Sequence, residues 1–172
     1  FFIDQVTASI ASERPEDVAA LDLEMLRQTA TAVVAATPVF KSLKGKAPPD
    51  GARAFRVRVE LIYARPLQKL GPHSPASPAA DVLLQVELAP LDGREVMREM
   101  ARGTEPFGEG ASTRQPAYQR AARKAIETAS HALLLQLRAE EKPEPDLIAD
   151  LTSPDRQVRD YAVRALADRR SA

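Results

Sequence analysis

Histidine is the residue type that most often serves in acid–base chemistry near neutral pH, so the two histidines of this sequence are the first candidates for it. His131 lies in a helical pattern beside a stripe of alanines, and His73 lies in a proline-rich segment. General-base catalysis would need a Ser, Cys or Asp partner at an interpretable spacing, and His131 has none. We therefore interpret His131 as a structural or surface residue and His73 as an exposed one.

A glycine-containing segment, residues 103–114, precedes a predicted helix, as phosphate-binding loops do. It lacks the Lys-Ser/Thr ending of a P-loop, and Glu105 and Glu109 would repel an anion. The glycine spacing of a Rossmann fold is absent as well. These residues are more consistent with a connector than with a nucleotide site.

Several arginines follow one strand pattern and give it a basic edge: Arg53, Arg56, Arg58 and Arg65. A nucleic-acid platform would need exposed rings for base stacking, yet the chain is 5% aromatic and has no Trp. Glu60 also dilutes the positive charge. A solvated sheet face therefore explains these arginines better than nucleic-acid binding does.

Three carboxylates near the end of the chain could suggest a metal site: Asp146, Asp150 and Asp155. Their spacing differs from the Asp-x-Asp-x-Asp-Gly pattern of a calcium loop, and helix capping accounts for them more simply. The absence of Cys and the presence of only two His exclude zinc-cysteine and multi-histidine sites. We predict no catalytic residue, no cofactor and no metal site.

Composition narrows the range of functions further. The 172 residues fit one domain, or one domain with an appendage. The 24 basic and 24 acidic residues cancel, so the chain lacks the overall charge of a nucleic-acid binder. No apolar run reaches 18 residues, which predicts no transmembrane segment. The opening residues already resemble a strand, and we expect the native start to lie upstream.

Hydrophobic periodicity predicts the elements that would position these groups. Strands are expected over residues 1–9, 39–43, 55–63, 82–88 and 94–102, helices over 17–36 and 116–140, and loops over 44–51, 66–80 and 103–115. Asp92-Gly93 is a hairpin signal between the last two strands. This order predicts an α+β fold in which two long helices cover a mostly antiparallel sheet of about four to five strands.

The segment Leu147–Leu166 predicts a short helix, a Ser-Pro-Asp turn and a second amphipathic helix. It resembles a HEAT repeat at Leu147, Leu151, Pro154-Asp155, Val158-Arg159, Ala162 and Ala165-Leu166. The resemblance implies that further repeats follow Ala172 and form a concave protein-binding surface, because one such unit cannot bury its own apolar face. From it we predict Asp155, Arg159 and Arg164 as protein-binding residues.

The preceding residues resemble, in their element order, the small α/β domain of exported bacterial outer-membrane lipoproteins, a group that includes LpoB and the N-terminal domains of CsgG and TolB. The features are an opening strand, a helix over Asp17–Ala36, two long strands, the Asp92-Gly93 hairpin and an alanine-rich helix over Tyr118–Leu137. The resemblance implies a non-enzymatic protein that docks on protein partners in the periplasm or at the outer membrane. The lipidated cysteine of such proteins is absent from this sequence.

These observations predict an α/β sandwich-like domain over residues 1–142 and a HEAT-like helix pair over 143–172. The predicted function is protein–protein interaction or scaffolding without enzyme activity or nucleic-acid binding. The partner would be another protein, bound through helix faces of the repeat and the free edge of the sheet. The alternative is a small-ligand binder or enzyme with a site between the sheet and loops 66–80 and 103–115. A spacer that only positions downstream repeats is a third reading.

Overall fold

The computed structural model describes residues 1–11, 21–67, 78–108 and 113–171. Two compact units are present, Phe1–Ala129 and Ser130–Ala172. The division falls inside helix α2 (Arg114–Glu141), whereas the sequence placed a boundary at residue 142. Each unit is described below by itself.

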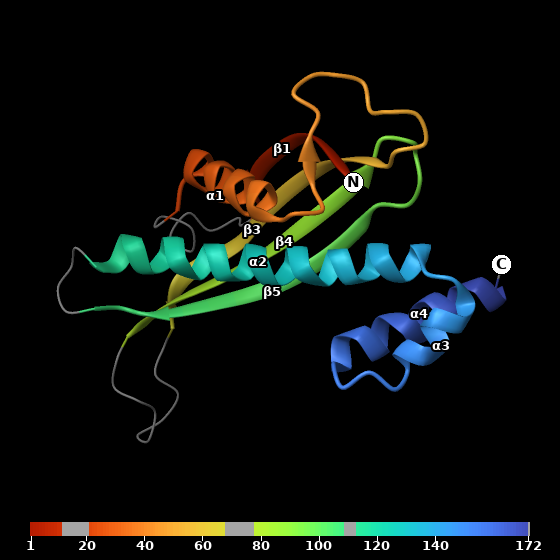
Figure 1. The fold of residues 1–172 in the computed structure, drawn as a ribbon. Coiled ribbons are helices and arrows are strands. Elements are labelled where there is room, and N and C mark those ends of the chain that lie inside the picture. Colours follow the sequence, from red (N-terminus) through yellow and green to blue (C-terminus); the bar gives the residue numbers. More distant parts are fainter. Residues whose placement is uncertain (12–20, 68–77, 109–112, 172) are drawn as a thin grey trace. The chain divides into compact units, whose positions relative to one another are not determined.

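The first unit contains a five-stranded sheet with the order β2-β1-β3-β4-β5 (Figure 1). The strands are β1 (Phe2–Ile10), β2 (Lys41–Ser42), β3 (Ala54–Leu67), β4 (Ala79–Pro90) and β5 (Met97–Pro106). Every predicted strand is present, and Gly93 turns the hairpin between β4 and β5 with a φ of 79°. The predicted loop over 103–115 is wrong in its first part, because β5 continues through Gly103 to Pro106.

The sheet is mixed, and the prediction of a mostly antiparallel sheet is therefore wrong. Strand β1 runs parallel to both of its neighbours, β2 and β3, while β3, β4 and β5 pair antiparallel. The reason lies in the connection between β1 and β2. Helix α1 (Leu23–Ala36) carries the chain back along the sheet, so that β2 starts beside the beginning of β1 and runs in the same direction.

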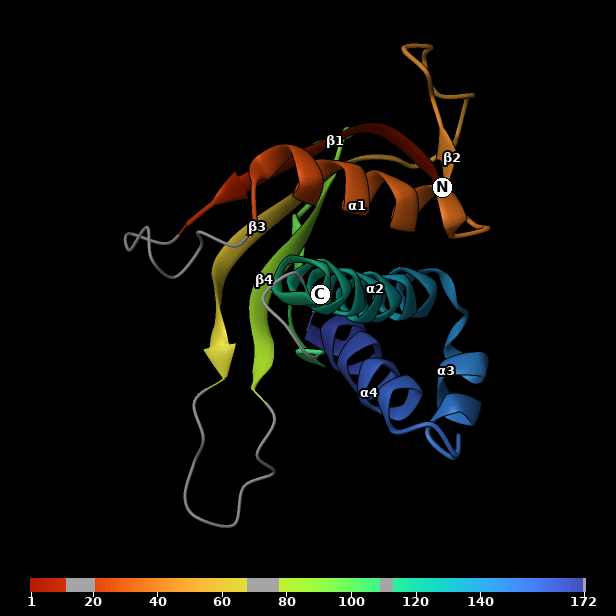
Figure 2. The same cartoon turned by 90° about the vertical axis from the view of Figure 1, so that its left-hand side faces the viewer.

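Helix α1 and the first part of α2 lie on the same face of the sheet (Figures 1 and 2). Of the two, only α2 is long, with 28 residues against 14 for α1, which corrects the prediction of two long helices. The shortening is at the start of α1, where Asp22 is the N-cap and the helix begins at Leu23. Residues 17–20 of the predicted helix lie outside the described part of the chain.

Alternating side chains of the central strands form the core beneath these helices. They are Phe55, Val57, Val59 and Leu61 of β3 and Val82, Leu84, Val86 and Leu88 of β4, each at most 2% exposed. The pairing of β3 with β4 shifts between Leu61 and Tyr63. Alternation places Tyr63 opposite Leu83 on the outer face, although the sequence placed it with the inward residues.

The alanine stripe of α2 lies very close to β5. Ala121 and Ala125 are completely buried, as are Ala117 and Ala122. Gly103 makes this approach possible, since a Cβ there would overlap the carbonyl oxygen of Ala121 and lie 3.2 Å from the backbone nitrogen of Ala125. Beside this contact, Glu105 of β5 pairs with Lys124 of α2 at 3.1 Å.

The opposite face of the sheet is polar and carries cross-strand ion pairs. Arg102 donates to both carboxylate oxygens of Asp81, at 2.5 and 2.9 Å, and Arg98 donates to Glu87 at 2.8 Å. The Asp81 carboxylate is buried although the Arg102 side chain is 52% exposed. Two fixed charge-assisted hydrogen bonds compensate the burial of this carboxylate.

The second unit consists of the end of α2 with α3 (Glu144–Asp150) and α4 (Arg156–Ser171), the two helices predicted around the Ser-Pro-Asp turn. Its core is formed by Ala132, Ala139, Leu147, Tyr161 and Ala162. Arg169 of α4 donates to the carbonyl oxygens of Glu140 and Lys142, at 3.0 and 2.6 Å. The end of α2 thus packs against Leu147, Tyr161 and Ala162, whereas Ile148, Leu151 and Val163 of the same unit stay exposed.

No helix in the described ranges has both the length and the hydropathy that crossing a bilayer requires.

We predict that Gly103→Ala lowers the free energy of unfolding by about 3 kcal/mol, because the added methyl group forces α2 away from β5. Urea denaturation monitored by circular dichroism measures this change. The matched control is Thr104→Ala, at the next and exposed position of β5, which should change stability by less than about 0.5 kcal/mol. Equal effects of the two substitutions would contradict the close packing.

Candidate functional site

A groove of about 570 Å³ lies between α1 and β1. Figure 2 shows α1 lying along β1, with β2 beside the beginning of that strand. The groove is lined by Ile3, Asp4, Gln5, Val6, Thr7, Ala8, Arg27, Thr31, Val34, Ala35, Phe40 and Ser42. It therefore follows a strand edge on one side and a helix on the other.

The strand edge in this groove is open because β2 is much shorter than β1. Strand β2 pairs only with Phe2 and Ile3, and the next residue after β2, Leu43, donates to the carbonyl oxygen of Ile3 at 2.9 Å. Beyond Ile3, no strand of the described residues pairs with this side of β1. Of the remaining seven residues of β1, Asp4 lies at a shift in the register and the other six, Gln5–Ile10, pair with β3 alone among the described strands.

One hydrogen bond at the end of the β1–β3 pairing shows which backbone groups of β1 point toward β3 and which point toward the open edge. The N–H of Ala11 donates to the carbonyl oxygen of Leu61 at 2.8 Å. Because backbone groups alternate in direction along a strand, Gln5, Thr7 and Ser9 also point toward β3. The N–H and C=O groups of Val6, Ala8 and Ile10 then point toward the open edge. These groups are the main-chain donors and acceptors that an added strand requires.

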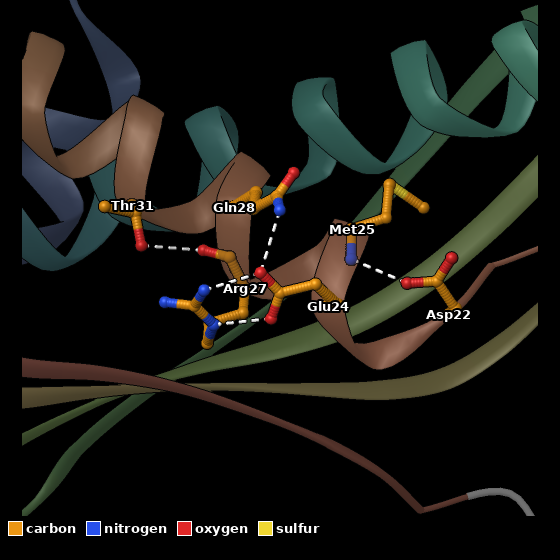
Figure 3. A network of polar contacts seen from close by, with 6 residues as sticks. All are labelled: Asp22, Glu24, Met25, Arg27, Gln28 and Thr31. Carbon is orange, nitrogen blue, oxygen red and sulfur yellow. Dashed lines mark hydrogen bonds and ion pairs between the residues drawn. The ribbon is translucent and has the colours of Figure 1, made fainter.

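The helix wall of the groove is fixed by a network at the start of α1 (Figure 3). The Asp22 carboxylate accepts from the backbone N–H of Met25 at 2.7 Å and caps the helix. Glu24 accepts two hydrogen bonds from Arg27, at 2.8 and 2.6 Å, and one from Gln28 at 2.8 Å. This network holds the Arg27 guanidinium on the helix surface at the rim of the groove.

These hydrogen bonds change the acidity of the Glu24 carboxyl. The bond from Arg27, followed by that from Gln28, lowers the pKa of Glu24 from 4.5 to about 2. The hydrogen bond that Arg27 donates to Glu24 also raises the pKa of Arg27. Both side chains therefore carry their charges near neutral pH, and they form an exposed ion pair at the rim of the groove.

The groove offers binding groups more readily than reactive ones. Its two charged lining residues are each engaged by a neighbour, Arg27 by Glu24 and Asp4 by Arg56 at 3.3 Å. The rest of the lining consists of small or apolar side chains with the hydroxyls of Thr7, Thr31 and Ser42. Main-chain groups and a partly apolar surface are the recognition elements that this arrangement supplies.

The histidines and the C-terminal carboxylates considered as candidate site residues are not among those that line the groove. His131 is exposed on α2, and His73 lies outside the described residues. Within the described ranges, no three His, Cys, Asp or Glu side chains are grouped to hold a metal ion. Asp150 pairs with Lys142 at 2.5 Å.

The arginines of β3 lie on the outer face of the sheet and are engaged there. Arg56 pairs with Asp4, and Arg58 pairs with Glu60 at 3.3 Å. Arg65 stacks on the ring of Tyr63, with its guanidinium carbon 4.3 Å from the ring centre. This arrangement corresponds to the solvated face expected from the sequence.

The three residues predicted to bind a protein all contact their own helix pair. Arg159 donates to the carbonyl oxygens of Ser153 and Pro154, at 2.5 and 3.0 Å. Asp155 accepts from the backbone N–H of Gln157 at 2.8 Å. The guanidinium carbon of Arg164 lies 5.4 Å from the ring centre of Tyr161. Their role toward a partner stays a prediction.

The alternative predicted from the sequence is a small-ligand or enzyme site between the sheet and loops 66–80 and 103–115. Residues 68–77 and 109–112 of these loops lie outside the described ranges.

Comparison with known proteins gives a limited result. No protein-family model matches the chain, and no curated protein matches it either. The HEAT resemblance of residues 143–172 therefore gains no support.

Several solved structures are loosely similar to this chain, among them the following three. A protein of Xanthomonas campestris from the DUF330 family has a TM-score of 0.47 at 11% identity, over 73% of this chain and 79% of its own. A Caulobacter crescentus protein provisionally classed as a lipoprotein has a TM-score of 0.43 at 14% identity, over 80% and 93%. PelC of Paraburkholderia phytofirmans, which is a dodecamer, has a TM-score of 0.43 at 14% identity, over 74% and 83%. At these values the likeness carries no functional residue to this chain.

We predict that Glu24 titrates with a pKa of about 2, measured by NMR of its side-chain carboxyl carbon as the pH is lowered. The folded value lies below the ordinary 4.5, so the pair stabilises the fold above about pH 4.5, and this contribution is lost as the pH falls toward 2. In Arg27→Met the pKa of Glu24 should rise toward 4.5, whereas the distant control Arg98→Met should leave it unchanged. A Glu24 pKa that is insensitive to Arg27→Met would show that the pair does not form.

Proposed function

We propose that this chain is a non-enzymatic protein-binding module, and that an extended peptide segment of the partner binds in the α1–β1 groove as an added strand. The observation that carries this proposal is the open edge of β1 beyond β2, which faces the groove over most of the strand. Strand addition to a sheet edge supplies main-chain hydrogen bonds for affinity and side-chain pockets for specificity.

The groove also fits the side chains of such a strand. Alternate residues of an added strand would point to the helix-covered side of the sheet, where Val34, Ala35 and Phe40 line the groove. The small side chain of Ala35 leaves space for residues of moderate size. An apolar residue at every second position of the peptide is therefore the preference that this geometry favours.

The cellular location belongs to the same proposal. We place the protein in the bacterial envelope, in the periplasm or at the outer membrane, because its order of strands and helices resembles that of envelope lipoproteins. Its partner would be a protein of that compartment with an accessible extended segment. Scaffolding follows if such a segment is bound while the second unit contacts another protein.

A second candidate function is suggested by the size of the groove. A volume of about 570 Å³ lies within the range of roughly 300–1,000 Å³ that small-ligand sites occupy. An apolar small molecule would contact the helix wall and would not need the main-chain groups of β1. The two functions are therefore distinguished by their dependence on the strand edge.

Selection of random twelve-residue peptides on the immobilised chain tests the proposal. We expect the bound peptide to slow hydrogen exchange at the amides of Val6, Ala8 and Ile10, because these N–H groups become paired. The amides of Gln5, Thr7 and Ser9 already donate toward β3 and should change little. Protection confined to other parts of the chain, or failure to select any peptide, would contradict strand addition.

Two substitutions separate the candidate functions. Ala35→Trp fills the groove and should abolish binding of either ligand, while the matched control Ala32→Trp, exposed on α1 outside the groove lining, should not. Ala8→Pro removes one edge N–H and should weaken peptide binding roughly fivefold, since a hydrogen bond contributes about 1 kcal/mol. Binding that Ala35→Trp abolishes but Ala8→Pro leaves intact would favour a small ligand.

A further inference from the structure

The other end of the sheet has an open edge of a different kind. Among the described residues, β5 is the last strand of the sheet and pairs with β4 on one side. The N–H of Phe107 donates to the carbonyl oxygen of Pro78 at 2.8 Å, which continues this ladder by one residue. By alternation, odd-numbered residues of β5 point toward β4. The backbone groups of Arg98, Met100, Arg102 and Thr104 point outward.

Two of the devices that prevent pairing with another strand, a bulge and a proline in the interior of the strand, are absent from β5 in the described residues. Charged side chains are present, however, and restrict how a second strand can pair. The ladder between β4 and β5 runs over ten residue pairs without a register shift, so no bulge twists the edge away. The only proline of β5, Pro106, is at its end. Met100, in the middle of the strand, is 57% exposed. A long regular edge with an exposed apolar residue at its centre is a surface suited to strand pairing.

We propose that a second copy of this chain pairs with this edge, β5 against β5 in antiparallel orientation, and forms a continuous ten-stranded sheet with its two-fold axis at Ala101. The occupant is a second copy because antiparallel pairing of identical strands is closed by one two-fold axis and satisfies the same groups on both chains. Strand β5 has outward backbone N–H and C=O groups on both sides of Ala101, so two copies can donate and accept the same hydrogen bonds about an axis at this residue.

The charge pattern of β5 selects the position of the axis. Residues whose side chains point to the helix-covered face must lie opposite residues that point to the same face. Three registers that pair most of the strand meet this condition, with the two-fold axis at Met100, Ala101 or Arg102. An axis at Met100 places Arg98 of each copy opposite Arg102 of the other. An axis at Arg102 places the two Arg102 residues opposite each other, and Glu99 of each copy opposite Glu105 of the other. Like charges directly opposite each other are destabilising. The register centred on Ala101 avoids every such pair.

The side chains of this register are already arranged to accept the second copy. Met100 would lie opposite Arg102 of the second copy, whose guanidinium is held by Asp81, so that its aliphatic part is available to the Met100 side chain. Arg98, held by Glu87, would lie opposite Thr104 of the second copy. The two intramolecular ion pairs thus fix both arginines before association.

Sedimentation equilibrium of the 172-residue chain tests the proposal by measuring how the dimer dissociation constant depends on the charge at the exposed residue Met100. Met100→Glu would add two attractive pairs with Arg102 across the interface, and Met100→Arg would add two repulsive ones. We expect the dimer dissociation constants of the two variants to differ by at least roughly tenfold, with Met100→Glu the tighter. Because Arg98 and Arg102 flank position 100 on the same face of the strand, thermal unfolding of the two variants at low, monomeric concentration measures the effect of the new charge within one chain separately from dimerisation.

The register is tested separately by oxidation of single-cysteine variants, since the chain has no cysteine of its own. Ala101→Cys should give a disulfide-linked dimer, because this residue lies opposite itself in a non-hydrogen-bonded pair. Arg98→Cys, which lies opposite Thr104, should not. A chain that stays monomeric in all variants, or a dimer that ignores the charge at position 100, would overturn the proposal. Because β5 lies outside the α1–β1 groove, this outcome would leave the peptide-binding proposal standing, and the reverse also holds.

Discussion

The contact of the α2 backbone with β5 at Gly103 is the constraint on which the first unit depends. Small residues on both sides, Gly103 on the strand and the alanines of α2, let the two backbones meet directly. The helices can then cover one face of the sheet closely enough to bury the valines and leucines of β3 and β4. The opposite face keeps its polar side chains, and among the described residues no further strand pairs with β1 beyond Ile3 or with the outer side of β5.

Local patterns predicted the elements well where each residue's environment follows from its neighbours. The alternation from Phe55 to Leu61 gave β3 correctly, as did the Asp-Gly signal for the hairpin at Gly93. The errors have non-local causes. The sequence predicts a loop that starts at Gly103, whereas the lack of a side chain at this residue serves the packing of α2. Tyr63 was placed in the core because a shift in pairing with β4 cannot be seen in one strand alone.

The parallel pairing of β1 and the α1–β1 groove were missed for a related reason. The groove exists because β2 pairs with only the first residues of β1, and the length of that pairing depends on where α1 returns the chain. The sequence indicated a short strand near Val39 and a free sheet edge, but not which strand would be exposed. Similarly, the pattern at Arg159 suits either a neighbouring repeat or its own turn, and in the structure the arginine binds Ser153 and Pro154.

The strand order β2-β1-β3-β4-β5 has a consequence for valency. Three interstrand steps separate β1 from β5, which amounts to about 14 Å. Occupants of the two edges would therefore not collide, and a single chain could hold both at once. A β5-linked pair would then present two identical grooves at the far ends of one sheet. Such a pair could bind a ligand with repeated segments far more tightly than either groove alone, because the second binding event would be intramolecular.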